Sequence, residues 1–266
     1  MRANVRVVDA CLDSDMDYSI LQDQDVVFHL VSTVIPTNSN QHITQDIKAN
    51  IVFSSVLFES CIRYKVKKVI FISSGGTVYG KDVSCPISED MPTNPITSYG
   101  IQKLTIEKLL FLYNYMYGLD YRIIRLSNPY GPYQRPNGLL GAVTTFTYNA
   151  LKGKPILVYG DGSVIRDFIY IDDVIKGIVN ISNNETKYKV YNLGSGSGTS
   201  IKTLLNTVSS ALSCSLNLIY KESRPVDVPV NYLNISRYEQ EFGTLNSISL
   251  TEGIKKTAKF FKERGC

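Results

Sequence analysis

The chain has 266 residues, of which 44% are hydrophobic and 20% are charged, and its formal net charge is +4. This size and composition are typical of a soluble globular protein with a substantial core, built as one large domain or as one domain and a lobe. The charge is scattered, no apolar run reaches the roughly 20 residues of a membrane span, and no signal-peptide core follows Met1, so we expect neither a nucleic-acid nor a membrane partner.

Short apolar runs rich in β-branched residues indicate strands, and apolar residues at helical spacing indicate helices. In the first half of the chain we expect strands at 5–9, 25–31, 69–72 and 121–126. We expect helices at 18–21, 46–66 and 98–117, the last of which ends at Gly118. Strands that alternate with helices predict a doubly wound parallel sheet.

After Pro132 the pattern becomes mixed. We expect helices at 139–151, 173–182, 201–212 and 248–262, with Asp172 and Ser200 as helix caps. Shorter strands are expected at 155–159, 168–171, 189–192 and 217–220. This smaller half of the chain is expected to carry a substrate.

The most informative stretch follows the apolar run at 69–72, which leads into a loop of hydroxyls and glycines, SSGGTVYG. Tyr99 opens the next helix and Lys103 comes four residues later, so both side chains lie on one helix face. A cation near a phenol lowers its pKa from about 10. Such a tyrosine can take a proton from a sugar or alcohol hydroxyl. Tyrosine and lysine occur at this spacing by chance on many helices, and the preceding loop is what makes this pair a candidate active site.

Five motifs occur in order, namely SSGGTVYG (73–80), SYGIQK (98–103), RLSNPYGP (125–132), DGSVIRDFIYIDDV (161–174) and YNLGSGSGTS (191–200). Together they resemble the extended short-chain dehydrogenase/reductase family, in the branch of UDP-glucose 4-epimerase-like nucleotide-sugar epimerases. The resemblance implies an α/β fold, an N-terminally truncated Rossmann-like sheet with a smaller mixed α/β lobe. Residues 1–132 would form the partial NAD-binding domain and 133–266 the substrate lobe, with 155–182 returning to the sheet.

Members of this family begin with a strand, a glycine-rich turn that approaches the cofactor pyrophosphate, and a helix. The first glycine of this chain is Gly75, which already belongs to the SSGGTVYG loop. The resemblance therefore implies a fragment that lacks the first two strands, or a chain that has abandoned NAD chemistry or borrows the missing part from a partner. The strand at 25–31 would then present a bare apolar edge, which favours aggregation or a homodimer.

The family match assigns catalytic roles to Tyr99, as proton donor and acceptor, and to Lys103. A third hydroxyl normally helps, but Gly75 occupies the position of the usual serine. Ser74 and Thr77 are the two candidates to replace it, and the sequence does not choose between them. Because this loop contains no carboxylate, the related dehydratase chemistry is disfavoured.

The resemblance also implies NAD as cofactor, held by Tyr99 and Lys103 together with Asp9, Leu30, Val31, Ser32, Asn50 and Ser73. His29 is expected to be a packed strand residue. A nucleotide sugar, with UDP as the expected carrier, would be bound by Asn128, Arg166, Arg224 and Asp227. Arginine suits a diphosphate because its charged fork matches phosphate oxygens in pairs.

The implied reaction is 4-epimerisation, in which Tyr99 takes the 4-hydroxyl proton while hydride leaves sugar C4 for NAD and later returns to the other face. Its setting would be sugar supply for surface polysaccharide. One alternative is an NAD(P)-dependent reductase of the same family, and another is a truncated, non-catalytic remnant. Five unpatterned cysteines indicate reduced thiols in a cytoplasmic protein.

Overall fold

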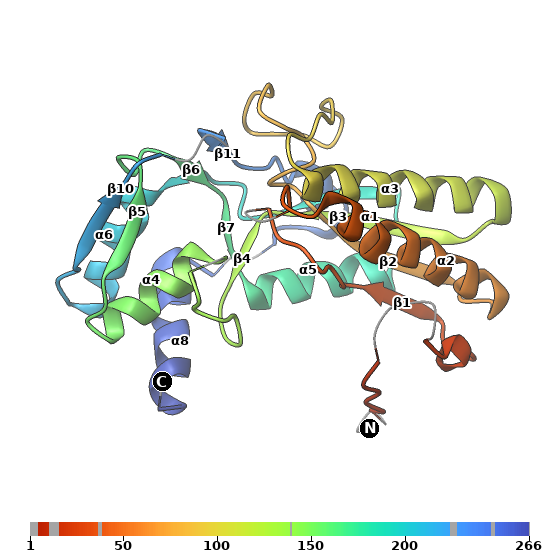
Figure 1. Ribbon diagram of the computed structural model, residues 1–266, viewed down its shortest axis with the longest axis horizontal. Coiled ribbons are helices and arrows are strands. Elements are labelled where there is room, and N and C mark those ends of the chain that lie inside the picture. Colours follow the sequence, from red (N-terminus) through yellow and green to blue (C-terminus); the bar gives the residue numbers. More distant parts are fainter. Residues whose placement is uncertain are drawn as a thin grey trace.

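The computed structural model describes residues 5–10, 16–36, 39–138, 140–223, 228–245 and 248–265. Its largest sheet has four strands in the order β1-β2-β3-β8, and all neighbouring strands are parallel. These strands are β1 (Val26–His29), β2 (Lys68–Ser74), β3 (Asp120–Leu126) and β8 (Val190–Leu193). Figure 1 shows this sheet on one side of the molecule and a smaller lobe on the other.

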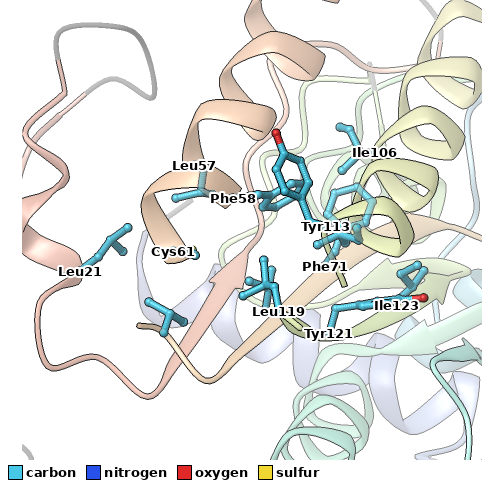
Figure 2. Close-up of a cluster of buried hydrophobic side chains, with 13 residues drawn as sticks. Leu21, Leu57, Phe58, Cys61, Phe71, Ile106, Tyr113, Leu119, Tyr121 and Ile123 are labelled. Atoms are coloured by element: carbon cyan, nitrogen blue, oxygen red, sulfur yellow. The ribbon is translucent and has the colours of Figure 1, made fainter. Parts of the chain in front are cut away.

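Helices cover both faces of this sheet because successive residues of each strand point to opposite sides. On one face, Val69 and Phe71 of β2 pack against α2 (Phe53–Arg63) and α3 (Ser98–Tyr117). This apolar cluster is drawn in Figure 2. On the other face, Ile70 lies in a second cluster with residues of α5 (Ile171–Asn183). Burial on both sides explains why the strands read as continuous apolar runs.

The helix predicted at 98–117, which contains Tyr99 and Lys103, is present. Helix α3 spans Ser98–Tyr117, the Thr97 side chain accepts a hydrogen bond from the Gly100 N–H, and Gly118 adopts the left-handed conformation with φ of 72°. The expected helix at 46–66 is also present, as α1 (Ile43–Ile47), a π-helical turn η2 (Lys48–Val52) and α2. The short helix at 18–21 is a 3₁₀ helix, η1 (Tyr18–Leu21).

The expected strand at 5–9 is wrong. These residues are irregular and exposed, with Val5 and Val7 at 80% and 88% exposure. An apolar alternating run becomes a strand only where a neighbouring strand takes up its backbone hydrogen bonds, and none of the described residues does so here. Within the described chain, β1 pairs with β2 alone, so the edge predicted at 25–31 is bare, and Phe28 is 44% exposed.

The smaller lobe is built on the parallel pair β5 (Ile156–Tyr159) and β10 (Leu218–Lys221). Three helices surround one apolar cluster beside this pair, namely α4 (Ala142–Leu151), α6 (Ile201–Leu212) and α8 (Leu250–Glu263). Residues 155–182 therefore do not return to the main sheet as a unit. Strand β5 stays in the lobe, whereas α5 packs on the main sheet and β8 joins it.

Short elements connect the two parts. Strand β4 (Asn128–Tyr130) pairs with β7 (Phe168–Tyr170), and β6 (Ile165–Arg166) lies between β9 (Thr199–Ser200) and β11 (Val230–Asn231). These strands, except β7, and helix α7 (Ser236–Phe242) were not predicted.

Ser200 caps α6 as expected. Asp172 is not a cap, because α5 begins at Ile171 and Asp172 lies inside its first turn. Within the described ranges, no helix has the length and apolar character to cross a membrane.

Candidate active site

A cavity of about 790 Å³ lies where the carboxyl ends of β2 and β3 face the smaller lobe. This is the edge at which open parallel sheets normally bind ligands. The start of α3, the junction of β3 with β4, the loop after β4 and strand β5 all contribute to its wall. Tyr99, Lys103, Ser74 and Thr77 line it together, so the four predicted catalytic side chains meet at one place.

Tyr99 and Lys103 make different contacts at the end of β2. The Tyr99 hydroxyl is hydrogen-bonded to the Ser74 side chain. Lys103 Nζ donates to the Ile72 carbonyl at 2.8 Å and lies 4.8 Å from the centre of the Phe71 ring. The Lys103 ammonium is 5.7 Å from the centre of the Tyr99 ring. Both side chains are thus fixed by the same strand end.

The acid strengths differ from expectation. We predicted that Lys103 would lower the pKa of Tyr99, but burial raises this pKa to about 12, and only the Ser74 hydrogen bond opposes the rise. Burial also lowers the pKa of Lys103 to about 8, against the opposing charge of Glu107. Loss of water is therefore the largest influence on the pKa of both groups.

The structure distinguishes the two candidate hydroxyls. Ser74 contacts Tyr99, whereas Thr77 Oγ1 is buried and has no hydrogen-bond partner in the described chain. A Cβ atom at Gly75 would lie 2.6 Å from Leu233 Cδ1, so a serine at this position would require Leu233 to move. Ser74 therefore lies where it can exchange a proton with Tyr99, whereas the Thr77 hydroxyl is closed off from the cavity surface and unpaired in the described chain.

The residues predicted to bind NAD separate into two groups. Leu30, Ser32 and Ser73 line the cavity, as do Tyr99 and Lys103. Ser73 nevertheless donates its hydroxyl proton to Glu107 Oε1 at 2.5 Å, so this proton is directed at the protein.

The other three predicted NAD contacts, Asp9, Val31 and Asn50, do not line the cavity. Asp9 and Val31 are exposed, and Asp9 lies in the irregular stretch before η1. Asn50 is buried, and its amide accepts from the Thr33 N–H at 3.0 Å and donates to Gln102 Oε1 at 2.8 Å. Its amide thus orders the segment after β1 against α3.

Two of the four predicted substrate residues are described, and both line the cavity. Asn128 Nδ2 donates to the Asp167 carbonyl at 2.9 Å. Arg166 donates through one terminal nitrogen to the Ile165 and Val228 carbonyls, at 2.9 and 2.6 Å. Arg224 and Asp227 lie outside the described residues.

Sequence reasoning missed several wall residues. The Ser127 hydroxyl and Gln134 Oε1 are buried without a partner in the described chain and line the cavity, as the Thr77 hydroxyl does. Buried polar atoms are normally paired, so these three are exceptions at residues of the cavity wall, and each atom is itself closed off from the cavity surface. Leu157 and Tyr159 line the wall from β5 and suit a flat base. The position of Ser127 and Gln134 in or just after the RLSNPYGP motif was the available signal, whereas β5 carried none.

These residues fit one half of NAD. Tyr99 and Lys103 offer a hydroxyl and a cation of the kind that can bind a ribose and its attached ring. The glycine-rich turn that would meet the pyrophosphate is not found in the sequence before Gly75. The fit therefore concerns the nicotinamide end of the cofactor.

Comparison with known proteins gives consistent matches. The model of the NAD dependent epimerase/dehydratase family matches residues 2–194. The UDP-glucose 4-epimerase of Mycolicibacterium smegmatis is 33% identical over 240 residues, which cover 90% of this chain and 77% of that protein. The dTDP-4-dehydro-6-deoxyglucose reductase of Escherichia coli is 32% identical over 236 residues, covering 88% of this chain and 73% of the reductase. The crystal structure of a Thermotoga maritima UDP-glucose 4-epimerase with UDP-glucose has a TM-score of 0.89 at 33% identity, covering 94% of this chain and 83% of that one.

Proposed function

The chain belongs to the NAD dependent epimerase/dehydratase family, and we propose that it is a nucleotide-sugar 4-epimerase that acts on a UDP-hexose or UDP-N-acetylhexosamine. The observation that carries this proposal is the hydrogen bond between Tyr99 and Ser74 in a cavity that Lys103 also lines. Epimerisation needs a group that takes and returns one proton at the same oxygen, and this pair has that chemistry.

The residues of the chain supply proton transfer and positioning. NAD, when bound, supplies the site that accepts a hydride from the sugar and returns it. Tyr99 takes the proton of the sugar 4-hydroxyl and later gives it back, and Ser74 relays this proton and stabilises the Tyr99 phenolate by hydrogen bonding. Lys103 supplies the nearby positive charge that favours the phenolate. Because burial raises the pKa of Tyr99 to about 12, we expect the protonated phenol to predominate before the ligands bind, and Tyr99 acts as a base only after this proton has passed to solvent.

The remaining wall supports recognition of the rest of the substrate. Arg166 is held by backbone carbonyls at the wall and offers a fixed charge to a diphosphate. Thr77, Ser127 and Gln134 also line this wall, and a shift of their side chains on ligand binding would bring their unpaired polar atoms within reach of sugar hydroxyls. Leu157 and Tyr159 offer an apolar and aromatic surface for the base.

The test is to supply the purified protein with NAD and to follow UDP-galactose and UDP-N-acetylgalactosamine separately by proton NMR. We expect conversion of at least one of them to its 4-epimer without net consumption of NAD. If correctly folded protein with added NAD converts neither UDP-galactose nor UDP-N-acetylgalactosamine, the proposal is refuted.

A reductase is the second candidate, and the similarity to the Escherichia coli reductase favours it. The same Tyr99 hydroxyl would then protonate a 4-keto sugar once per turnover. A reductase consumes one NADH or NADPH for each sugar, whereas an epimerase consumes none, so absorbance at the nicotinamide band separates them. A homodimer, a cytoplasmic location, the division into 1–132 and 133–266 and the possibility of a non-catalytic remnant stay predictions.

A further inference from the structure

A row of polar residues crosses the main sheet at its carboxyl edge. Ser73 on β2 lies opposite Arg125 on β3, and Arg125 lies opposite Asn192 on β8. All three are buried, at 3%, 6% and 0% exposure. Because Ser73 follows Phe71 by two residues, the row lies on the face that α3 covers. Polar residues at three successive strands are unexpected in a sheet buried on both sides.

Glu107 of α3 binds two members of this row at once. Its carboxylate accepts Arg125 N–H groups at 3.1 and 2.7 Å, one on each oxygen, and the Ser73 hydroxyl at 2.5 Å. The Arg125 and Glu107 side chains are 7% and 4% exposed. This is a buried, bidentate ion pair seated over a pair of opposite residues in neighbouring strands.

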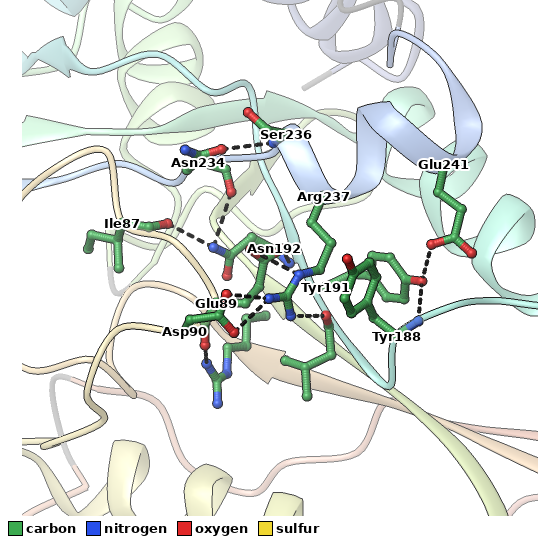
Figure 3. A network of polar contacts seen from close by, with 12 residues as sticks. Ile87, Glu89, Asp90, Tyr188, Tyr191, Asn192, Asn234, Ser236, Arg237 and Glu241 are labelled. Atoms are coloured by element: carbon green, nitrogen blue, oxygen red, sulfur yellow. Dashed lines mark hydrogen bonds and ion pairs between the residues drawn. The ribbon is translucent and has the colours of Figure 1, made fainter.

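The row continues toward the C-terminal segment. Arg125 also donates to the Tyr79 hydroxyl at 3.0 Å, and this hydroxyl donates to Asn192 Oδ1 at 2.7 Å. Figure 3 shows Asn192 among its next partners, where its side chain donates to the Ile87 and Asn234 carbonyls. The ion pair is therefore tied to strands, loop and C-terminal segment on all sides.

The same helix holds the strand end at three consecutive residues. Lys103 binds the carbonyl of Ile72, Glu107 binds the hydroxyl of Ser73, and Tyr99 binds the hydroxyl of Ser74. The middle contact belongs to Glu107, whose position is set in turn by Arg125. A change at Glu107 must therefore alter how the two flanking contacts are aligned.

We propose that Glu107 is a positioning residue, which aligns Lys103 and the Ser74 hydroxyl with Tyr99 by clamping Ser73 and Arg125. This inference rests on the proposed epimerase function for its kinetic consequences. Stability alone does not account for such a pair, because the desolvation of two buried charges offsets most of their attraction. A need to hold the end of β2 and helix α3 in one fixed geometry explains why the pair is present despite this desolvation.

Charge reinforces the geometric effect. The titratable groups that face Lys103 in the described chain are Tyr99 and Glu107 on its own helix and His29 on β1. Of these, the Glu107 carboxylate favours the protonated lysine and so keeps the pKa of Lys103 higher than burial alone would. Removal of this carboxylate should make Lys103 lose its proton at lower pH.

The experiment compares Glu107→Gln with Asp120→Asn. Asp120 pairs with the buried Arg122 at 2.6 Å on the same strand as Arg125, but at the other end of β3. Both variants remove a carboxylate from a buried arginine, so both should lower the melting temperature. Three quantities are measured for each: kcat, KM, and the pH dependence of Lys103 acetylation by acetic anhydride, read by mass spectrometry.

We expect Glu107→Gln to lower kcat at least ~10-fold with KM nearly unchanged, and to shift the acetylation profile of Lys103 to lower pH. Asp120→Asn should leave all three at wild-type values. Equal kcat and equal acetylation profiles in the two variants would overturn the proposal.

If Glu107→Gln does not fold, Ser73→Ala is the second variant. It removes one bond to Glu107 and unpairs no charge, and wild-type kcat in this variant would overturn the proposal as well. Absence of wild-type epimerisation would instead refute the proposed function, and the acetylation profiles would still test Glu107.

Discussion

The hydroxyl of Tyr99 is hydrogen-bonded to the side chain of Ser74. The bond joins the first turn of α3 to the last residue of β2. It brings the Tyr99 phenol and the Ser74 hydroxyl together at one wall of the cavity. The sequence alone left Ser74 and Thr77 as equal candidates for this contact.

Tyr99→Phe should lower kcat by about 10² to 10⁴, because general acid–base catalysis contributes this range. Affinity for the nucleotide sugar should stay within about 3-fold, since only the hydroxyl is removed and the ring remains. Steady-state kinetics and calorimetry with UDP-glucose measure the two effects. Turnover at the wild-type rate in this variant would remove Tyr99 from the mechanism.

Ser74→Ala and Thr77→Val should behave differently. Ser74 contacts Tyr99, so its loss should lower kcat about 10²-fold or more. Thr77 has a buried hydroxyl that awaits a partner, so its loss should weaken ligand binding by about 2- to 10-fold, the worth of one neutral hydrogen bond. The split between kcat and KM in the two variants decides the assignment, and the reverse pattern would exchange the two roles.

Arg166→Ala should raise the dissociation constant for UDP at least ~10-fold, because a hydrogen bond to a charged group contributes roughly 1.5–3 kcal/mol. Arg166→Lys should recover part of the affinity, since the charge remains while the fork is lost. Arg135→Ala is the matched control, because Arg135 is exposed on the loop after β4 and does not line the cavity. Titration calorimetry that gives the same affinity for all three variants would exclude a diphosphate role for Arg166.

The local parts of this site followed from the sequence, and the non-local parts did not. The spacing of Tyr99 and Lys103 and the apolar period of their helix are local, and α3 has the predicted bounds. The sequence motifs also identified the correct family and an α/β fold with a parallel sheet, as the family match and the Thermotoga maritima structure confirm. The row formed by Ser73, Arg125 and Asn192 depends on the register of strands far apart in the chain, which no spacing reveals.

The errors have a common physical origin in tertiary burial and pairing. The direction of the Tyr99 pKa was wrong because desolvation, which depends on the whole fold, raises this pKa more than the Ser74 hydrogen bond lowers it. The strand at 5–9 was wrong because an apolar pattern does not supply a neighbouring strand. Asp9 and Val31 are exposed and do not line the cavity, and their contact with the cofactor, expected from the family match, stays a prediction.

The last prediction concerns His29, whose side chain is 3% exposed and packs against Phe71. Its Nε2 lies 2.8 Å from Ser54 Oγ. Because the Ser54 hydroxyl proton is donated to the Asn50 carbonyl, Nε2 must carry the hydrogen and donate to Ser54. Burial, aided by the charge of Lys103, lowers the pKa of His29 to about 4 from its ordinary value of 6.5.

In the unfolded chain His29 therefore takes up a proton as the pH falls below 6.5, whereas in the folded protein it stays neutral down to about pH 4. Between these values the unfolded state holds more protons, so stability falls as the pH falls through this window. The full loss of stability is about 3 kcal/mol, since each pKa unit corresponds to about 1.4 kcal/mol, and part of it is present at pH 5.

His29→Phe keeps a ring beside Phe71 but cannot take up a proton, so its denaturation midpoint should fall less between pH 7 and pH 5 than that of the wild type. His42→Gln removes the other histidine, which is exposed, and should keep the wild-type decline. If His29→Phe loses as much stability as wild type over this range, the acid sensitivity arises elsewhere and the neutral, buried state of His29 does not control it.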